Sequence, residues 1–265
     1  MADIVASNVS IDIPIYDMAS NSLRKMLLGR VGGNFASEGS HVIIHALKDV
    51  SFEANAGDRI GLIGGNGSGK TTLLRVLSGV YPPTRGSIEV HGRISPMLDT
   101  QLGMSMDATG IENIRMCGVL WGLAREEIEA GIDDVASFTE LGEYLKVPVR
   151  TYSAGMRLRL AFAIATLRHP DILLLDEVIG VGDAAFFGRA YKRLQGLIER
   201  SRILFVASHT NKILEDLCTK LLWLHQGSLV AFAGVHEVLD AYTRDGPDVA
   251  RERFRQAPSA APAPV

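Results

Sequence analysis

The sequence lacks the features that mark a membrane-spanning chain or a nucleic-acid-binding one. None of its apolar runs approaches the roughly 18 residues that a bilayer crossing needs, and its formal net charge is only −3. The opening stretch MADIVASNVSIDIPI has no basic start followed by an apolar core, so we expect no signal peptide. Any role at a membrane is therefore expected to come through a partner, and nucleic acid is not an expected partner.

Cysteine is scarce as well. Cys117 and Cys218 are the two in the chain, and they form no CxxC motif. Their spacing predicts buried, reduced thiols, as in a cytosolic protein, rather than disulfides or a metal site. The apolar fraction of 47% and the charged fraction of 22% are ordinary for a globular domain.

Strand and helix patterns alternate along the chain in an order typical of an α/β protein. Strand patterns occur at 4–13, 42–55, 59–64, 171–178, 202–209 and 221–233. Helical periodicity occurs at 110–123, 125–141, 157–169, 184–201, 211–221 and 235–245. The last strand pattern contains Gln226 and Gly227, which predict a turn between two paired strands.

This order predicts a single domain over residues 1–246. Within it we expect a helical subdomain at about 97–168 and an inserted helix at about 18–40, between the first two strands. Residues 247–265 end in an Ala/Pro-rich run that cannot bury a core, so we expect them to be disordered.

A glycine-rich stretch lies between the strand pattern at 59–64 and a following helix. It fits G-x-x-x-x-G-K-[ST] in the strand–loop–helix context that this motif requires. Glycines let backbone N–H groups approach a phosphate, and the helix N-terminus attracts the anion. Lys70 supplies positive charge and the Thr71 hydroxyl ligates Mg²⁺; a glycine-rich turn with a surface lysine is the plain alternative. The candidate nucleotide-binding residues are Gly64, Asn66, Gly67, Ser68, Gly69, Lys70, Thr71 and Thr72.

Two later strands end in polar residues. ILLLDE places Asp176 and Glu177 after an apolar run. This suits an aspartate that holds Mg²⁺ through its water shell and a glutamate that orients or deprotonates the attacking water. FVASHT places His209 where it would contact a γ-phosphate or position that water. The alternatives are an acidic helix cap for the first pair and a structural role for the histidine.

The stretch YSAGM offers a second anion site. Ser153 is suited to cap the helix that follows, and Ala154 and Gly155 are small enough to leave its N-terminal amides open to an anion. Because the chain already has one phosphate loop, the economical explanation is that two copies meet head to tail. Each YSAGM stretch would then close over the γ-phosphate held by the other copy.

Taken in order, GGNGSGKTT, YSAGMRLRLAF, ILLLDE and VASHT resemble the motifs of ABC ATPase domains over roughly residues 4–243. ALKDVSFEANAGDRIGLIGGNGSGKTTLL, TGIENI and DEVIGVGDAAF resemble the polysaccharide-export branch, which contains O-antigen, capsule and teichoic-acid exporters. The resemblance implies an α/β fold in which a P-loop NTPase core carries an antiparallel β subdomain and an α-helical ABC subdomain.

The resemblance also implies the roles of single residues, with ATP and Mg²⁺ as cofactors. The catalytic residues would be Lys70, Glu177 and His209. The metal ligands would be Thr71, Asp176 and Asp99. The residues that reach the other copy's nucleotide would be Ser153, Ala154, Gly155 and Asp183.

The function implied is that of an ATP-hydrolysing subunit of an exporter of lipid-linked polysaccharide, with an O-antigen-like cargo favoured. A homodimer of these subunits would close around two ATP–Mg²⁺ and pull on a polytopic permease, expected in two copies, through grooves beside the helical inserts. The subunit would be peripheral, bound through the permease at the cytoplasmic face of the inner membrane.

Some positions depart from the family pattern. Ala154 replaces the second glycine of the common signature and Met156 replaces its glutamine, and the small alanine keeps access to the backbone. The Q-loop glutamine is not at its usual spacing. Counting back from Thr109 gives Asp99, with Gln101 two residues beyond, and an ordinary loop without this role is the alternative.

The region around the first strand has two further candidates. Tyr16 resembles the family's adenine-stacking aromatic, and an ordinary core or surface tyrosine is the alternative. SNSLRKML resembles the branch's insertion near the membrane partner, where Arg24 and Lys25 would face headgroups or substrate, with an ordinary solvated helix as the alternative. The tail is too short for a carbohydrate-binding domain, so we expect cargo to be recognised elsewhere.

Two other classes of protein are weighed against the exporter. A non-transport ABC ATPase acting on DNA or ribosomes would need a long coiled-coil insertion or a second ATPase unit, and the chain shows neither. An unrelated P-loop kinase or GTPase would leave YSAGM unexplained, and a guanine-reading N-K-x-D is missing.

Overall fold

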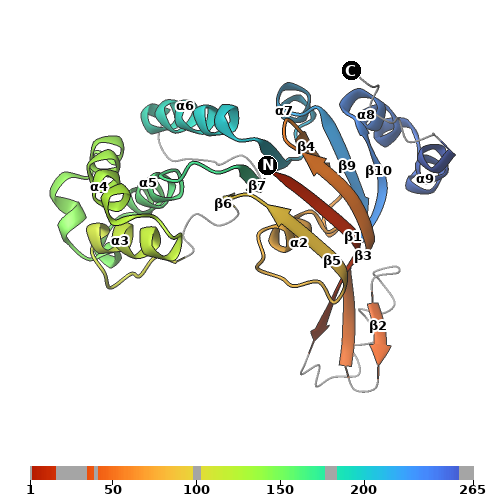
Figure 1. Ribbon diagram of the computed structural model, residues 1–265, viewed down its shortest axis with the longest axis horizontal. Coiled ribbons are helices and arrows are strands. Elements are labelled where there is room, and N and C mark those ends of the chain that lie inside the picture. The colour runs from red at the N-terminus through yellow and green to blue at the C-terminus, as the bar shows by residue number, and fades with distance from the viewer. Residues whose placement is uncertain (1, 16–34, 39–40, 98–102, 177–183, 257–265) are drawn as a thin grey trace. The chain divides into compact units, whose positions relative to one another are not determined.

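The computed structural model describes residues 2–15, 35–38, 41–97, 103–176 and 184–256. The chain divides into two compact units. The first comprises Met1–Arg93, Leu174–Glu177 and Arg202–Val265, and the second comprises Ile94–Leu173 and Val178–Ser201. The first unit contains most of the strands and the second most of the long helices (Figure 1).

One part of the first unit's sheet is antiparallel. β1 (Asp3–Ile15) pairs with β3 (His41–Asn55) on one side and with β5 (Arg85–His91) on the other. β2 (Phe35–Glu38) pairs with the start of β3. Buried and exposed residues alternate along much of β1 and β3, as expected of strands with one face on the core.

The other part of this sheet is mainly parallel. β4 (Arg59–Ile63) lies between β8 (Ile203–Ala207) and β9 (Lys220–His225), parallel to both. β10 (Ser228–Gly234) turns back antiparallel beside β9, and β7 (Ile172–Asp176) is the neighbour of β8. These strands are short and apolar because parallel strands are covered on both faces. Within the first unit the strand order is β5-β1-β3-β10-β9-β4-β8, followed by the Leu174–Asp176 part of β7.

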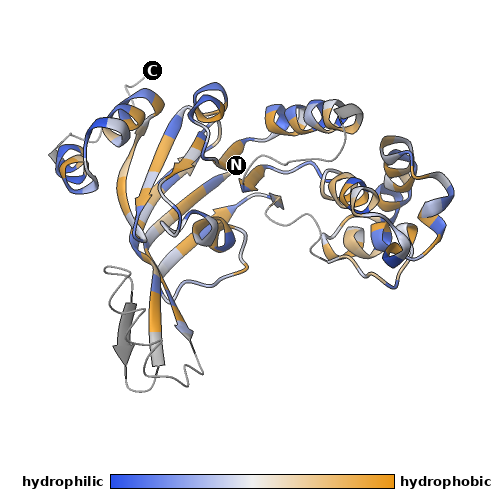
Figure 2. Cartoon of the chain, turned by 180° about the vertical axis from the view of Figure 1, so that it is seen from behind, coloured by the Kyte–Doolittle hydropathy of each residue, from blue (hydrophilic) through white to orange (hydrophobic). Residues whose placement is uncertain are grey.

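Three of the first unit's helices flank the parallel strands. α2 (Lys70–Leu77) follows β4, α7 (Asn211–Leu217) contacts β4, and α8 (Val235–Arg244) contacts β9 and β10. In the core, the ring of Phe52 lies with its centroid 5.9 Å from that of Phe205. Figure 2 shows hydrophobic residues running along these strands, so that burial of apolar surface holds the sheet in place.

The second unit is mainly helical. Its core includes Ile114, Val135, Leu160 and Ile164, all buried. The sequence TGIENI folds locally as a capped helix start: the Thr109 hydroxyl accepts from the Glu112 N–H at 3.2 Å, and the Glu112 carboxylate accepts from the Thr109 N–H at 2.7 Å. The hydrogen bonds that the Glu112 carboxylate accepts from the Thr109 N–H and the Thr109 hydroxyl lower the pKa of Glu112. The elements are β6 (Ile94–Met97), α3 (Gly110–Leu120), α4 (Arg125–Thr139), the 3-10 helices Gly142–Lys146 and Val149–Thr151, α5 (Ala154–Ala165) and α6 (Ala184–Arg200).

The second unit is larger than the helical subdomain expected at 97–168, because α6 belongs to it. Phe186 of α6 packs against Phe138 and Phe162, with ring centroids 5.2 and 6.2 Å away. Arg193 of α6 also pairs with Asp134 of α4. These are contacts between segments far apart in the sequence, so helical periodicity alone does not assign α6 to a unit.

The expectation of disorder at 247–265 is wrong for residues 247–256, and residues 257–265 lie outside the described part of the chain. Pro247–Gln256 form helix α9, which contacts α8 and β10. Proline suits the first turn of a helix and Asp248 suits its positive end. Ala250 is fully buried, and Arg253 pairs with Asp245 at 3.3 Å. Tertiary packing thus orders a segment whose composition is too polar to predict a helix.

Most of the other predicted strands and helices lie close to their expected bounds, but the helix expected at 211–221 ends at Leu217, and β9 begins at Lys220. The turn at Gln226 and Gly227 is confirmed by positive φ at both residues. β5 and β6 were not predicted. Residues 35–38 form strand β2 rather than part of the helix expected at about 18–40, because they pair with β3. The remainder of that expected helix lies outside the described residues, as do Arg24 and Lys25.

Both cysteines are free thiols, and the burial predicted for them is found in full only for Cys117. Cys117 is buried and Cys218 is half-buried, and burial raises the pKa of the Cys218 thiol to about 12. Burial likewise raises the pKa of Cys117. In the part of the chain that the structure describes, no helix is both long and apolar enough to cross a membrane.

Candidate nucleotide-binding site

The loop between β4 and α2 has the backbone of a phosphate-binding loop. Gly64, Gly67 and Gly69 have φ of 145°, 72° and 107°, in the region that glycine adopts without steric cost. A Cβ on Gly64 would lie 2.2 Å from the carbonyl oxygen of Leu224, so this position also has no room for a side chain. The loop conformation therefore depends on these glycines.

Lys70 is the first residue of α2 and is only 9% exposed. Its Nζ donates to the carbonyl oxygens of Gly64 at 2.7 Å and Gly65 at 3.2 Å. The ammonium group therefore lies across the loop, beside the positive N-terminal end of the helix. A fixed positive charge and a glycine-rich backbone at the N-terminal end of a helix together make a site for a phosphate chain.

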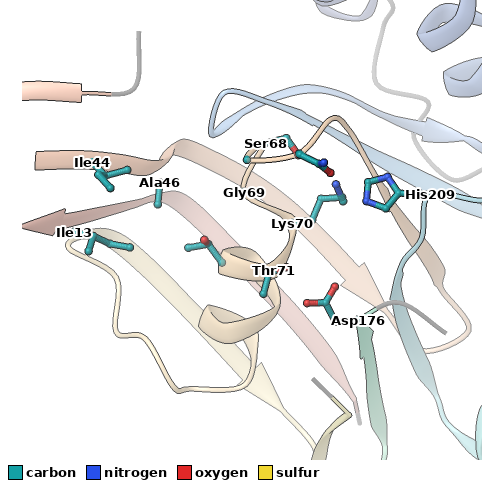
Figure 3. A pocket seen from close by; sticks show the side chains of 12 residues that line it. Ile13, Ile44, Ala46, Ser68, Gly69, Lys70, Thr71, Asp176 and His209 are labelled. Atoms are coloured by element: carbon teal, nitrogen blue, oxygen red, sulfur yellow. The ribbon is translucent and has the colours of Figure 1, made fainter. Parts of the chain in front are cut away.

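A pocket of about 390 Å³ opens over this loop. Figure 3 shows Lys70, Thr71, Asp176 and His209 gathered around one end of it. Asp176 ends β7 and is half-buried, whereas His209 follows β8 and is exposed. β4 and β8 are parallel, so their carboxyl ends lie at the same edge of the sheet. Asp176, at the end of β7, lines the same pocket.

The structure brings together most of the sequence-predicted loop residues with Asp176 and His209. The lining comprises Ile13, Ile44, Ala46, Asn66, Gly67, Ser68, Gly69, Lys70, Thr71, Thr72, Asp176 and His209. Ile13, Ile44 and Ala46 were not predicted. Ile13 of β1 is directly opposite Ile44 of β3, and the two form an apolar wall away from the charged end. The alternating patterns predict the two strands, but the sequence does not show which residues of one strand lie opposite which residues of the other.

Thr71 and Asp176 supply one hydroxyl and one carboxylate to the pocket. Mg²⁺ bound with a nucleotide takes one or two carboxylates or similar oxygens, keeps several waters and uses phosphate oxygens for the rest. The two side chains fit this demand. A dedicated cage is not required, and the described residues contain no group of three His, Cys, Asp or Glu side chains placed to hold a metal ion.

Ser153 is the N-cap residue of α5 in the second unit. Its side chain accepts from the N–H of Met156 at 3.2 Å, which confirms the predicted cap. Ser153, Ala154 and Gly155 are exposed, and a Cβ on Gly155 would find nothing nearer than the Ser153 hydroxyl at 3.9 Å. The helix start is therefore open to an anion or another chain, while Tyr152 before it is buried.

Four predicted site residues cannot be placed. Tyr16, Asp99, Glu177 and Asp183 lie outside the described residues, and so does Gln101. Their roles remain predictions from the sequence.

Comparison with known proteins agrees with this geometry. The family model described as "ABC transporter" matches residues 47–180, which contain the phosphate loop, the α5 cap and the end of β7. The chain belongs to the ABC transporter family. The predicted family is thus confirmed, and this chain is an ATPase of the P-loop α/β class. The family match does not favour the alternative of an unrelated P-loop kinase or GTPase.

Curated relatives of this ABC ATPase are export proteins by name. It is 42% identical to "O-antigen export system ATP-binding protein RfbE" of Yersinia enterocolitica over 86% of this chain and 96% of that one. It is 41% identical to "Teichoic acids export ATP-binding protein TagH" of Enterococcus faecalis over 74% of this chain, but only 44% of that longer protein. The match likewise covers 51% of the "O-antigen export system ATP-binding protein RfbB" of Myxococcus xanthus, at 36% identity.

Solved structures support the fold of the ABC ATPase. A "Structure of ATP binding subunit of ABC transporter" has a TM-score of 0.65 at 19% identity and covers 96% of this chain and 99% of that one. A dimeric ATP-binding cassette, MJ0796, in a post-hydrolysis state with ADP and Pi, has a TM-score of 0.63 at 18% identity, over 88% of this chain and 98% of that one. At such identities the likeness shows the fold alone.

Proposed function

We propose that this ABC ATPase drives export of a lipid-linked polysaccharide, O-antigen-like, through a separate membrane permease. The observation that carries the proposal is the relative RfbE, an O-antigen export protein that matches over 96% of its length. The TagH and RfbB relatives are export ATP-binding proteins too. A role on DNA or ribosomes is not favoured, since these relatives carry export names.

The proposed nucleotide site divides the work among the residues around the pocket. Lys70 and the loop amides bind the phosphate chain, and Thr71 and Asp176 would hold Mg²⁺, which supplies charge neutralisation at the transferred phosphoryl group. Glu177 would accept a proton from the attacking water, and His209, at the pocket's edge, would orient the γ-phosphate or that water. Stabilising the developing charge is the main catalytic effect.

The exposed start of α5 is proposed to act on the nucleotide that the other copy of the chain binds. Ser153, Ala154 and Gly155 at this helix start are exposed, and the positive N-terminal end of a helix favours a phosphate. We infer a homodimer in which this cap, with Asp183, completes the site formed by the other copy's Lys70. ATP would favour the closed dimer because it contacts both copies only in that state.

A surface on α3 fits the proposed permease contact. Met116, Val119 and Leu120 lie at i, i+3 and i+4, which places them on one helix face. Val119 and Leu120 are 68% and 69% exposed, the two highest values among the exposed large hydrophobic residues of the described part of the chain, and they are adjacent. A membrane-subunit segment with an apolar face would cover them. Through two permease copies the ATPase would be held at the cytoplasmic face of the membrane.

The function is tested by co-expressing the chain with the permease and following export of lipid-linked polysaccharide. The double change Val119→Asp with Leu120→Asp is expected to lower both permease recovery and export tenfold or more, since burying a charge without a partner costs at least about 1.4 kcal/mol. Val249→Asp is the matched control, because Val249 is also exposed, at 61%, but lies on α9.

Two results would contradict the assignment. Export that continues without the chain would remove it from the exporter. Recovery of DNA or ribosomes in place of a polytopic membrane protein would favour the non-transport alternative.

A further inference from the structure

The turn between β9 and β10 lies directly against the phosphate loop, although it is far away in the sequence. The N–H of Gly227 donates to the carbonyl oxygen of Ser68 at 3.0 Å. The carbonyl oxygen of Gly227 accepts from the N–H of Lys48, on β3, at 2.8 Å. One peptide segment of the turn thus links the loop to the antiparallel part of the sheet.

The packing at this turn has no room for a side chain. A Cβ on Gly227 would lie 2.8 Å from the carbonyl oxygen of Ala46, and one on Gly69 would lie 2.9 Å from the same oxygen. A Cβ on Gly69 would also lie 3.6 Å from the Cα of Gly227. On the hairpin's other strand, the carbonyl of Leu224 blocks a Cβ at Gly64. Three backbone segments therefore touch at glycines, and Figure 3 shows the Ala46 and Gly69 side of this junction.

The turn geometry fixes which residue can occupy position 227. Gln226 and Gly227 have φ of 48° and 78°, as in the two-residue hairpin turn that needs positive φ at both positions. Gln226 is exposed, whereas Gly227 is buried against the loop. Next to it, Ser228 pairs with Lys48 where β10 meets β3. The hairpin is held in register at the point where it touches the loop.

We propose that Gly227 is a positioning residue for ATP: the β9–β10 turn holds the Ser68 peptide, and with it Gly69 and the start of α2, where the phosphate chain requires them. The proposal rests on the assignment of ATP to this loop. Groups that bind a reacting ligand must be held to within about 0.5 Å, and supporting contacts supply that restraint. A side chain at position 227 would clash with the Ala46 carbonyl oxygen. The turn would then have to move away from Ala46, or the Ser68 peptide would be displaced.

The test compares Gly227→Ala with Gly79→Ala. Gly79 has φ of 76°, almost that of Gly227, but nothing lies within 4 Å of its added Cβ. Both changes place alanine in a left-handed conformation, so both should lower the melting temperature. Only Gly227→Ala is expected to raise the KM and Kd for ATP, by about tenfold, since small displacements of supporting groups can cost up to about a hundredfold. Equal KM values for the two variants would overturn the proposal.

A second measurement uses the unaltered turn, in case Gly227→Ala fails to fold. Amide hydrogen exchange is followed in the Glu177→Gln chain with and without ATP and Mg²⁺. We expect ATP to slow exchange both in the phosphate loop and at residues 225–229. Slowing in the loop without slowing in the turn would overturn the proposed role of Gly227. No slowing in the loop would contradict the nucleotide site itself, and the positioning role with it.

Discussion

Lys70→Ala is expected to lower ATP affinity by about a hundredfold, since a hydrogen bond to a charged group contributes about 1.5–3 kcal/mol. It is also expected to abolish hydrolysis, since losing an aligned donor to the charge that develops on the transferred phosphoryl group costs about 3–4 kcal/mol of transition-state stabilisation. Lys70 is 9% exposed, and its Nζ is fixed beside the carbonyls of Gly64 and Gly65. Binding is measured by calorimetry and turnover by phosphate release.

Lys146→Ala is the control for this change. Lys146 pairs with Glu143 at 2.9 Å on the surface of the second unit, and its side chain is 64% exposed. Surface pairs of this kind contribute little to stability, about 1 kcal/mol at most. The control should bind and hydrolyse ATP like the unaltered chain. Normal ATP affinity in Lys70→Ala would mean that the loop does not bind the phosphate chain.

Glu177→Gln is expected to lower kcat by about a thousandfold while ATP still binds, because a positioned general base contributes about a hundredfold to ten-thousandfold. The amide matches the carboxylate in shape but cannot accept the proton of the attacking water. ATP should then persist in the site, and a stable dimer should accumulate. Analytical ultracentrifugation with ATP and Mg²⁺ measures the dimer, and single-turnover hydrolysis measures the chemical step.

The double variant Lys70→Ala with Glu177→Gln separates ATP binding from the dimer. It should remain monomeric with ATP, because the nucleotide that joins the two copies is not held. Full turnover in Glu177→Gln alone would remove this residue from the role of base.

The phosphate loop could be predicted from the sequence, because its functional residues follow one another along the chain. The loop from Gly64 to Thr71 needs positive φ and open amides, and these requirements appear directly as glycines beside a lysine. Asp176 and His209 could be added because each follows an apolar strand, and parallel strands present their carboxyl ends together. The α5 cap was visible for the same local reason.

The rest depends on contacts between distant segments. Ile13 and Ile44 form a wall of the pocket only because β1 and β3 pair in one particular register. Gly227 contacts the phosphate loop only because the β9–β10 hairpin folds back on it. β5 was missed because most of its residues are exposed and Gly86 interrupts its pattern. α9 was missed because only a few of its residues are apolar, and its order comes from packing against α8 and β10.

The shared active site is tested most directly by mixing two inactive subunits, Lys70→Ala and Ser153→Arg. If the α5 cap acts on the other copy's nucleotide, each mixed dimer has one intact site, and random pairing should restore about a quarter of the activity. If hydrolysis requires both sites at once, the mixed dimer would not turn over. One occluded ATP per mixed dimer would then still show that one site is intact. A mixture that neither hydrolyses nor occludes ATP would contradict a site built from two copies.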